Sequence, residues 1–262
     1  MIMPGFDREQ KRKDIVNYSR KLMLSGRVAE LCETEATPRQ EDFLHRVLSE
    51  EIARRERGKK SRLLNRAGFP VFKSFEEYDF SDIRLPPAFS RDELLSCHFV
   101  DEKRNLVLYG GVGTGKTHMS IALGISACEK GSAVRFFTVT ELVLKLSDAY
   151  RNGTLECLVR DLKHLDLLIL DEWGYVPVDR EGSQLLFRII ADSYESKSLI
   201  LTTNLEFSKW GGIFTDEQMA AAMIDRLVHH GHLIMFEAKS YRMTHALMRH
   251  TAQPKVQPRK EP

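Results

Sequence analysis

The chain has few cysteines and no long apolar run. Its 4 cysteines lie far apart in 262 residues, and none forms a Cys-x-x-Cys pair. That spacing indicates neither a zinc site nor a disulfide framework. No uninterrupted apolar stretch approaches the roughly 18 residues that a membrane span needs, and no apolar signal region stands near the start of the sequence. We therefore expect a protein of the reducing cytoplasm with no membrane partner.

A large charge of one sign is also missing, but the charges are unevenly distributed. The formal net charge is only +2. Residues 1–66 contain 16 Lys and Arg against 11 Asp and Glu, whereas the remaining residues contain 23 against 26. A basic N-terminal part on a mildly acidic body is typical of a protein with a polyanionic partner. It is equally typical of a solvated helical face, so charge alone leaves both interpretations open.

Residues 1–66 are predicted to form a small all-helical domain that binds DNA or a protein partner. A helix should start at Thr37, because Thr37 can cap it, Pro38 suits its first turn and Gln40 can complete a capping box. Its apolar stripe consists of Phe43, Leu44, Val47, Leu48 and Ile52. Basic residues follow on this helix or just past it. The candidate DNA contacts among them are Arg54, Arg55, Arg57, Lys59, Lys60 and Arg62.

The rest of the chain divides into a connector, a large domain and a tail. Residues 67–100 contain three prolines among scattered aromatics, which fits a packed connector. Residues 101–250 form the large domain, and residues 251–262, with three more prolines, are expected to be a disordered tail. In the large domain, short apolar runs alternate with helical stretches. The predicted strands are residues 105–109, 133–139, 166–170, 198–202 and 232–236.

These five runs are nearly continuous in apolar residues, as in strands that are buried on both faces. Their alternation with helices predicts an α/β fold with a central parallel five-stranded sheet that has helices on both sides. The carboxyl ends of parallel strands lie along one edge of such a sheet, where ligands collect.

A glycine-rich loop follows the first of these strands and matches the phosphate-binding pattern G-x-x-x-x-G-K-[ST] in full. Glycines let the backbone turn its amides inward, and the helix that follows offers free N–H groups and a positive dipole end. Lys116 should reach the β- and γ-phosphates, and Thr117 should ligate Mg²⁺. The expected ATP contacts are Gly110, Gly111, Val112, Gly113, Thr114, Gly115, Lys116, Thr117 and His118.

Two other strand ends carry polar residues suited to the same site. Asp171 and Glu172 follow the run Leu167–Leu170, and Asn204 follows Leu199–Thr203. Asp171 can hold Mg²⁺ through water, and Glu172 can polarise a water in line with the γ-phosphate. Asn204 can hydrogen-bond that water or the γ-phosphate. Hydrolysis needs a carboxylate in the position of Glu172, whereas simple binding does not.

Together the three elements resemble the AAA+ P-loop ATPases, and within them the IstB family, ATPase helpers of bacterial insertion-sequence transposition related to the DnaC helicase loaders. The likeness runs over about residues 15–250. Besides the nucleotide motifs it rests on shorter blocks. These are Arg62–Leu64, Ala67–Pro70, Phe75–Phe80, Asp171–Tyr175, Trp210–Gly211 with Phe214, Ile224–His230 and Lys239–Arg242.

The resemblance assigns further roles. Arg226 matches an arginine finger that completes a neighbouring subunit's site, which implies a homo-oligomer with shared ATP sites; from the residues alone it could pair with Asp225 or Glu217. Arg242 matches a sensor-2 arginine, or forms a surface pair with Tyr241. Residues 140–165 should form two helices separated by Asn152-Gly153; by themselves these are an ordinary amphipathic pair, and by the resemblance they match an insertion that lines the nucleic-acid path. Its candidate DNA contacts are Lys145, Arg151, Arg160 and Lys163.

The sequence thus predicts an ATPase that uses ATP and Mg²⁺, assembles on target duplex DNA and recruits or stimulates a transposase. A replicative helicase loader of the DnaC type would have the same core with a different N-terminal domain. A small-molecule phosphotransferase would generally lack Glu after the metal Asp and would have an Arg-rich lid, which the sequence does not contain. A DNA-bending scaffold that barely turns ATP over would not need Glu172 and Asn204.

Overall fold

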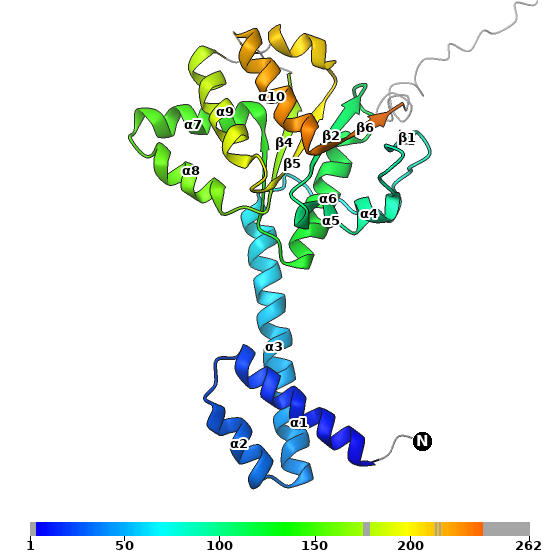
Figure 1. Ribbon diagram of the computed structural model, residues 1–262, viewed down its shortest axis with the longest axis vertical. Helices are drawn as coiled ribbons and strands as arrows, with labels where there is room; N and C mark the ends of the chain where they lie inside the picture. The colour runs from blue at the N-terminus through cyan, green and yellow to red at the C-terminus, as the bar shows by residue number, and fades with distance from the viewer. Residues whose placement is uncertain (1–3, 175–178, 213, 215, 238–262) are drawn as a thin grey trace, which may run out of the picture. The chain divides into compact units, whose positions relative to one another are not determined.

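The computed structural model describes residues 4–174, 179–212, 214 and 216–237 (Figure 1). The chain forms two compact units, Met1–Arg62 and Leu63–Pro262. Unit 1 contains helices α1 (Pro4–Lys21) and α2 (Gly26–Thr34) and most of α3 (Pro38–Ala67). None of the helices that the structure describes is both long enough and apolar enough to cross a membrane.

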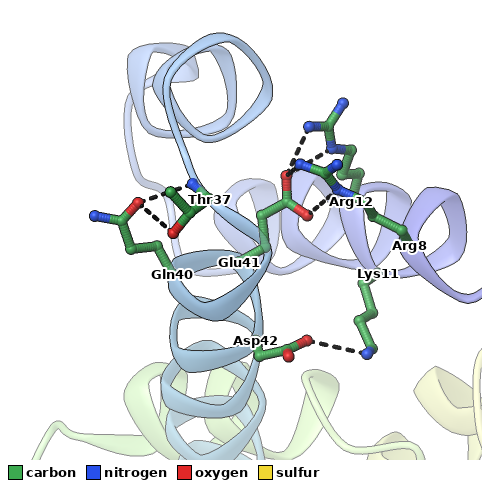
Figure 2. Close-up of polar contacts among 7 residues, drawn as sticks. All are labelled: Arg8, Lys11, Arg12, Thr37, Gln40, Glu41 and Asp42. Atoms are coloured by element: carbon green, nitrogen blue, oxygen red, sulfur yellow. Dashed lines mark hydrogen bonds and ion pairs between the residues drawn. The ribbon is translucent and has the colours of Figure 1, made fainter.

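The predicted start of α3 is confirmed, with one difference in its hydrogen bonds. The amide and the hydroxyl of Thr37 both donate to Gln40 Oε1, each at 2.8 Å (Figure 2). The Gln40 side chain therefore reaches back to the cap residue as in a capping box. The other bond of a capping box, from the Gln40 N–H to the Thr37 hydroxyl, is not among the hydrogen bonds of the described residues; the hydroxyl instead donates to the Gln40 side chain.

A buried carboxylate ties α1 to α3. Glu41 is only 1% exposed, and its oxygens accept hydrogen bonds from Arg8 at 2.8 and 2.9 Å and from Arg12 at 2.6 and 2.9 Å (Figure 2). The hydrogen bonds from Arg8, with smaller contributions from Arg12, lower the pKa of Glu41 to about 2. Two charge-assisted pairs thus satisfy this buried acid.

The predicted apolar stripe of α3 is too wide. Leu48 is buried in the core of unit 1, and Leu44 and Ile52 pack against that core. Phe43 and Val47 are instead 61% and 44% exposed. Each of them precedes a core residue by one position, about 100° around the helix, because an α-helix has 3.6 residues per turn. The core of unit 1 therefore covers only the face of α3 that carries Leu44, Leu48 and Ile52.

Unit 2 contains a six-stranded sheet in the order β1-β6-β2-β5-β4-β3. The strands are β1 (Ile83–Arg84), β2 (Asn105–Gly110), β3 (Val134–Thr138), β4 (Leu167–Trp173), β5 (Ser198–Thr203) and β6 (Gly231–Phe236). The five predicted strands are confirmed and parallel. The prediction of a purely parallel five-stranded sheet was wrong, because β1 pairs antiparallel with β6. With two residues, β1 is too short to leave a periodic signal.

Helices cover both faces of this sheet. On one face lie α4 (Arg91–Leu95), α5 (His98–Asp101) and α6 (Lys116–Lys130). On the other lie α7 (Val139–Arg151), α8 (Leu155–Lys163), α9 (Arg180–Ser193), α10 (Glu217–His229) and the 3-10 helix η1 (Phe207–Gly212). Strand residues alternate between the two cores: Leu167 and Ile169 face α6, whereas Leu168 and Leu170 face α7 and α9. The predicted layers are confirmed.

Candidate nucleotide-binding site

Strands β2, β5 and β4 are parallel neighbours, so their carboxyl ends meet at one edge of the sheet. The glycine-rich loop leaves β2 there and enters α6 at Lys116. Asp171 and Glu172 lie near the end of β4, and Asn204 follows β5. The sheet therefore brings together three segments that are far apart in the sequence.

The loop has the backbone that its glycines permit. Gly113 and Gly115 have φ angles of 76° and 97°, in the left-handed region that side chains disfavour. Lys116 is 8% exposed, and its Nζ donates to the carbonyl oxygens of Gly110 and Gly111 at 2.8 and 2.6 Å. The ammonium group therefore lies over the loop, where the loop amides and the N-terminus of α6 favour anions.

Thr117 and Asp171 meet as predicted for a metal site. The Thr117 hydroxyl lies 3.1 Å from Asp171 Oδ1, and the Asp171 carboxylate is only 4% exposed. A hydroxyl and a carboxylate are hard oxygen donors, which suit Mg²⁺ when substrate phosphates supply further ligands. The residues present thus fit the ion that a P-loop ATPase requires.

Glu172 stands at an irregularity in β4. Leu170 is paired with Leu201 and Trp173 with Thr203, so two residues of β4 lie opposite the single residue Thr202 of β5. This is a β-bulge, and Glu172 has a φ angle of 63° there. β4 thus continues past both carboxylates to Trp173, beyond the predicted end at residue 170. The bulge leaves Asp171 buried and Glu172 exposed.

Asn204 carries an unsatisfied acceptor. Its Oδ1 is buried and has no hydrogen-bond partner within the part of the chain that the structure describes. Asn204 does not itself line the cavity described next, although Thr202 and Thr203, immediately before it, do. A buried acceptor without a donor is uncommon and calls for a partner such as a water molecule.

A cavity of about 620 Å³ joins these segments. It is lined by the loop from Val112 to His118 and by Glu172, and connector residues between Pro70 and Ile83 form another part of its wall. Sequence reasoning missed that wall, because it interpreted residues 67–100 only as a packed connector. The signal for it in the sequence is the aromatic block Phe75–Phe80, which contains Tyr78.

Tyr78 is a connector residue that touches the loop. Its hydroxyl donates to the Gly115 carbonyl at 3.1 Å, and its ring centroid lies 4.8 Å from that of His118. His118 in turn lies 2.8 Å, through Nε2, from the carbonyl of Ser74. A Cβ at Gly115 would come within 3.0 Å of the Tyr78 hydroxyl oxygen. Burial raises the pKa of Tyr78 well above its ordinary value, so the phenol stays a donor.

Arg226 lies away from the chain's own cavity. It is in the last turn of α10, which leads to the start of β6, whereas the glycine-rich loop lies at the other end of the parallel strands. Its guanidinium donates to the Ala222 carbonyl at 2.8 Å and lies 5.4 Å from the Phe187 ring centroid. Among the described residues it makes no ion pair with Asp225 or Glu217. Arg242 and Tyr241 lie outside the described residues.

The candidate DNA contacts are exposed and lie in two places. On α3, Arg54 and Arg55 bond Glu51 at 2.9 and 2.8 Å, and the exposed positions that follow are Arg57, Lys59, Lys60 and Arg62. The predicted pair of helices in residues 140–165 is confirmed as α7 and α8. On that pair, Lys145 forms an ion pair with Glu141 at 3.7 Å, and Lys163 forms one with Asp192 at 3.3 Å. Arg160 Nη2 lies 3.3 Å from Cys157 Sγ, and Arg151 is exposed.

Comparison with known proteins places this site in a family context. The model of the IstB-like ATP binding protein family matches residues 26–248. A Pseudomonas aeruginosa protein named as the ATP-binding protein of insertion sequence IS21 is 38% identical over 206 residues, covering 77% of this chain and 76% of that protein. Its counterpart for insertion sequence IS5376 in Geobacillus stearothermophilus is 35% identical over 202 residues, covering 77% and 80%.

The fold also has a likeness among solved structures. The crystal structure of DnaI matches with a TM-score of 0.51 and 20% identity, covering 65% of this chain and 90% of that one. At this identity the likeness concerns the fold alone.

Proposed function

Because the chain belongs to the family of IstB-like ATP-binding proteins, we propose that it is an ATPase that assembles on duplex DNA and recruits or stimulates a transposase. The observation that carries the proposal is a set of four residues: Lys116 and Thr117 line one cavity, Asp171 is bonded to Thr117, and Glu172 lines the same cavity. Binding alone would need the first three. The fourth is a solvent-accessible carboxylate beside the metal aspartate, which suits a group that activates water.

ATP is the substrate in this proposal. The loop amides and the N-terminus of α6 hold the triphosphate, and Lys116 exchanges the carbonyls of Gly110 and Gly111 for β- and γ-phosphate oxygens. Thr117 and Asp171 would hold Mg²⁺, which neutralises charge on the phosphates when it is bound. Tyr78 and other connector residues line the cavity beside the loop, and Tyr78 bonds the loop at Gly115.

In hydrolysis, the Glu172 carboxylate accepts a proton from a water molecule that lies in line with the γ-phosphorus. The water oxygen bonds to the γ-phosphorus while the bond between that phosphorus and the β–γ bridging oxygen breaks. The products are ADP and inorganic phosphate. Asn204 supplies an amide at the same strand edge. That amide would hydrogen-bond the attacking water or the γ-phosphate once ATP is bound.

Arg226 acts on a neighbouring copy in this proposal. Arg226 lies at the amino-terminal ends of the parallel strands, whereas the chain's own loop lies at their carboxyl ends. It therefore serves a site that another subunit presents. An arginine supplied in trans stabilises the charge that develops on the transferred phosphoryl group. Hydrolysis should then depend on assembly of the subunits.

The DNA and transposase parts of the proposal rest on charge and kinship. Exposed Lys and Arg side chains on α3 and on α7–α8 suit phosphate contacts without base readout. The relatives from Pseudomonas and Geobacillus are named for insertion sequences, whose movement needs a transposase. A protein of this kind would act on target DNA of unrelated sequence.

The test is ATP turnover by the purified chain alone, with duplex DNA and with single strands, and with Lys116→Ala as a background control. We expect duplex DNA to raise turnover and to bind in preference to single strands. Absence of turnover above the Lys116→Ala background in every condition would refute the ATPase proposal. A strong preference for single strands would favour the helicase-loader alternative.

A further inference from the structure

One hydroxyl group bonds both acidic residues of β4. Thr202, near the end of β5, is 2% exposed. Its Oγ1 donates to Asp171 Oδ1 at 2.5 Å and accepts the backbone N–H of Glu172 at 3.0 Å. A hydroxyl has one proton to give and lone pairs to receive, so both bonds can form at once. No other side-chain type of this size offers that combination except serine.

The β-bulge explains why a side chain is needed at this point. In a regular ladder the amide of a β4 residue would pair with the backbone of β5, but here Asp171 and Glu172 together lie opposite Thr202. The Glu172 amide is thus displaced from the ladder, and the Thr202 hydroxyl accepts its bond instead. The left-handed backbone of Glu172 is unfavourable for a residue with a side chain and persists only where its surroundings hold it.

The same hydroxyl also orients the metal aspartate. Asp171 Oδ1 accepts hydrogen bonds from two hydroxyls on different elements, Thr117 of α6 at 3.1 Å and Thr202 of β5. The carboxylate is buried, so bulk water cannot replace a lost donor. Groups that bond to a metal-binding residue without touching the metal commonly fix its orientation.

We propose that Thr202 is a positioning residue for hydrolysis, which holds the Asp171 carboxylate and the Glu172 backbone in one fixed relation. The inference rests on the proposed ATPase function and deepens it. Although Thr202 lines the cavity, its hydroxyl bonds Asp171 and the Glu172 amide, so it acts through these two neighbours on β4. A merely structural hydroxyl would contribute to folding but would leave the metal dependence of nucleotide binding unchanged.

The experiment compares three variants of the full chain. Thr202→Val keeps the shape and removes the hydroxyl, and Thr202→Ser keeps the hydroxyl. Ser198→Ala is the matched control, because Ser198 is a buried hydroxyl at the other end of β5 that donates to the Phe99 carbonyl at 3.0 Å. For each variant, ATP turnover is measured together with the affinity for a non-hydrolysable ATP analogue, with Mg²⁺ and with EDTA.

We expect Thr202→Val to lose about 10- to 100-fold in turnover and in the gain of analogue affinity that Mg²⁺ provides, as for other outer-shell partners of a metal site. Its analogue affinity in EDTA should match the unchanged chain, which also shows that the variant is folded. Thr202→Ser should restore both properties, and Ser198→Ala should alter neither.

Three results would overturn the inference: Thr202→Val with unchanged turnover and Mg²⁺ dependence, Thr202→Ser as impaired as Thr202→Val, or Ser198→Ala equally impaired. If the unchanged chain hydrolyses ATP, these results count against Thr202 alone. If the unchanged chain does not hydrolyse ATP in any condition, the proposed function fails first and the inference fails with it.

Discussion

Replacing Glu172 by Gln should separate ATP binding from ATP hydrolysis. The change replaces one carboxylate oxygen by an NH₂ group, so the side chain keeps its shape. The hydrogen bond from the backbone N–H of residue 172 to Thr202 remains. The bulge should therefore persist, and so should the cavity wall. What is lost is a proton acceptor, and a positioned general base contributes about 10²–10⁴ in rate, or about 3–5 kcal/mol of activation free energy.

Purified Glu172→Gln should thus bind ATP with unchanged affinity and turn it over at that reduced rate. Lys116→Ala is the complementary variant, because it removes the ammonium group that lies over the loop and should abolish binding. Binding is measured by equilibrium titration and turnover by release of inorganic phosphate. Near-normal turnover in Glu172→Gln would refute the reasoning and leave the carboxylate with only a structural role.

Three other perturbations test separate parts of the proposal. Mixing Arg226→Ala with Lys116→Ala subunits should restore some of the turnover that each lacks alone, since each supplies the group missing in the other; no recovery at any ratio would leave Arg226 structural. In the fourfold alanine variant of Arg55, Arg57, Lys59 and Lys60, the slope of log K for duplex DNA against log salt concentration should become shallower by about one unit per lost phosphate contact. The ATPase activity of this variant without DNA should stay intact. Glu41→Gln should lower the unfolding free energy in urea, followed by circular dichroism, by about 1–3 kcal/mol. Because the folded pKa of Glu41 lies near 2, below the ordinary 4.5, that loss is complete above pH 4.5 and should vanish as the pH falls toward 2; a pH-independent difference would contradict it.

The sequence predicted the parts of the fold that leave a repeating signal. Five strands buried on both faces read as continuous apolar runs, and the glycine-rich loop has a fixed spacing, so strands and loop were located to within a few residues. β1 could not be found in this way, because Ile83–Arg84 pairs with β6 only through a contact more than 150 residues away in the chain. A two-residue strand has no periodicity of its own.

The parts of the site that were missed depend on contacts between distant segments. Tyr78 and Gly115 are 37 positions apart, and their hydrogen bond exists only because the connector folds back over the loop. Phe43 and Val47 show the opposite case: local periodicity favoured burial, but burial needs a neighbouring element, and α1 and α2 do not extend over that side of α3. Which face of a helix is buried depends on tertiary packing and cannot be read from the periodicity of that helix alone.

The bulge in β4 leaves no periodic signal in the sequence and depends on contacts between distant segments. It determines which of the two adjacent carboxylates is buried and which is exposed. In a straight strand Asp171 and Glu172 would point to opposite faces of the sheet. The extra residue shifts the alternation, so that Leu170 and Trp173 enter the same core, where Trp173 packs 5.0 Å from Trp210 and 5.4 Å from Phe214 between ring centroids. Burial of Trp173 thus fixes the strand beyond the bulge, while Leu170 fixes it before. Between these two anchors, one carboxylate is buried beside Thr117 and the next is open to the cavity. Under the proposed function, the bulge therefore lets Asp171 serve as a metal ligand and Glu172 as a base although they are adjacent in the sequence.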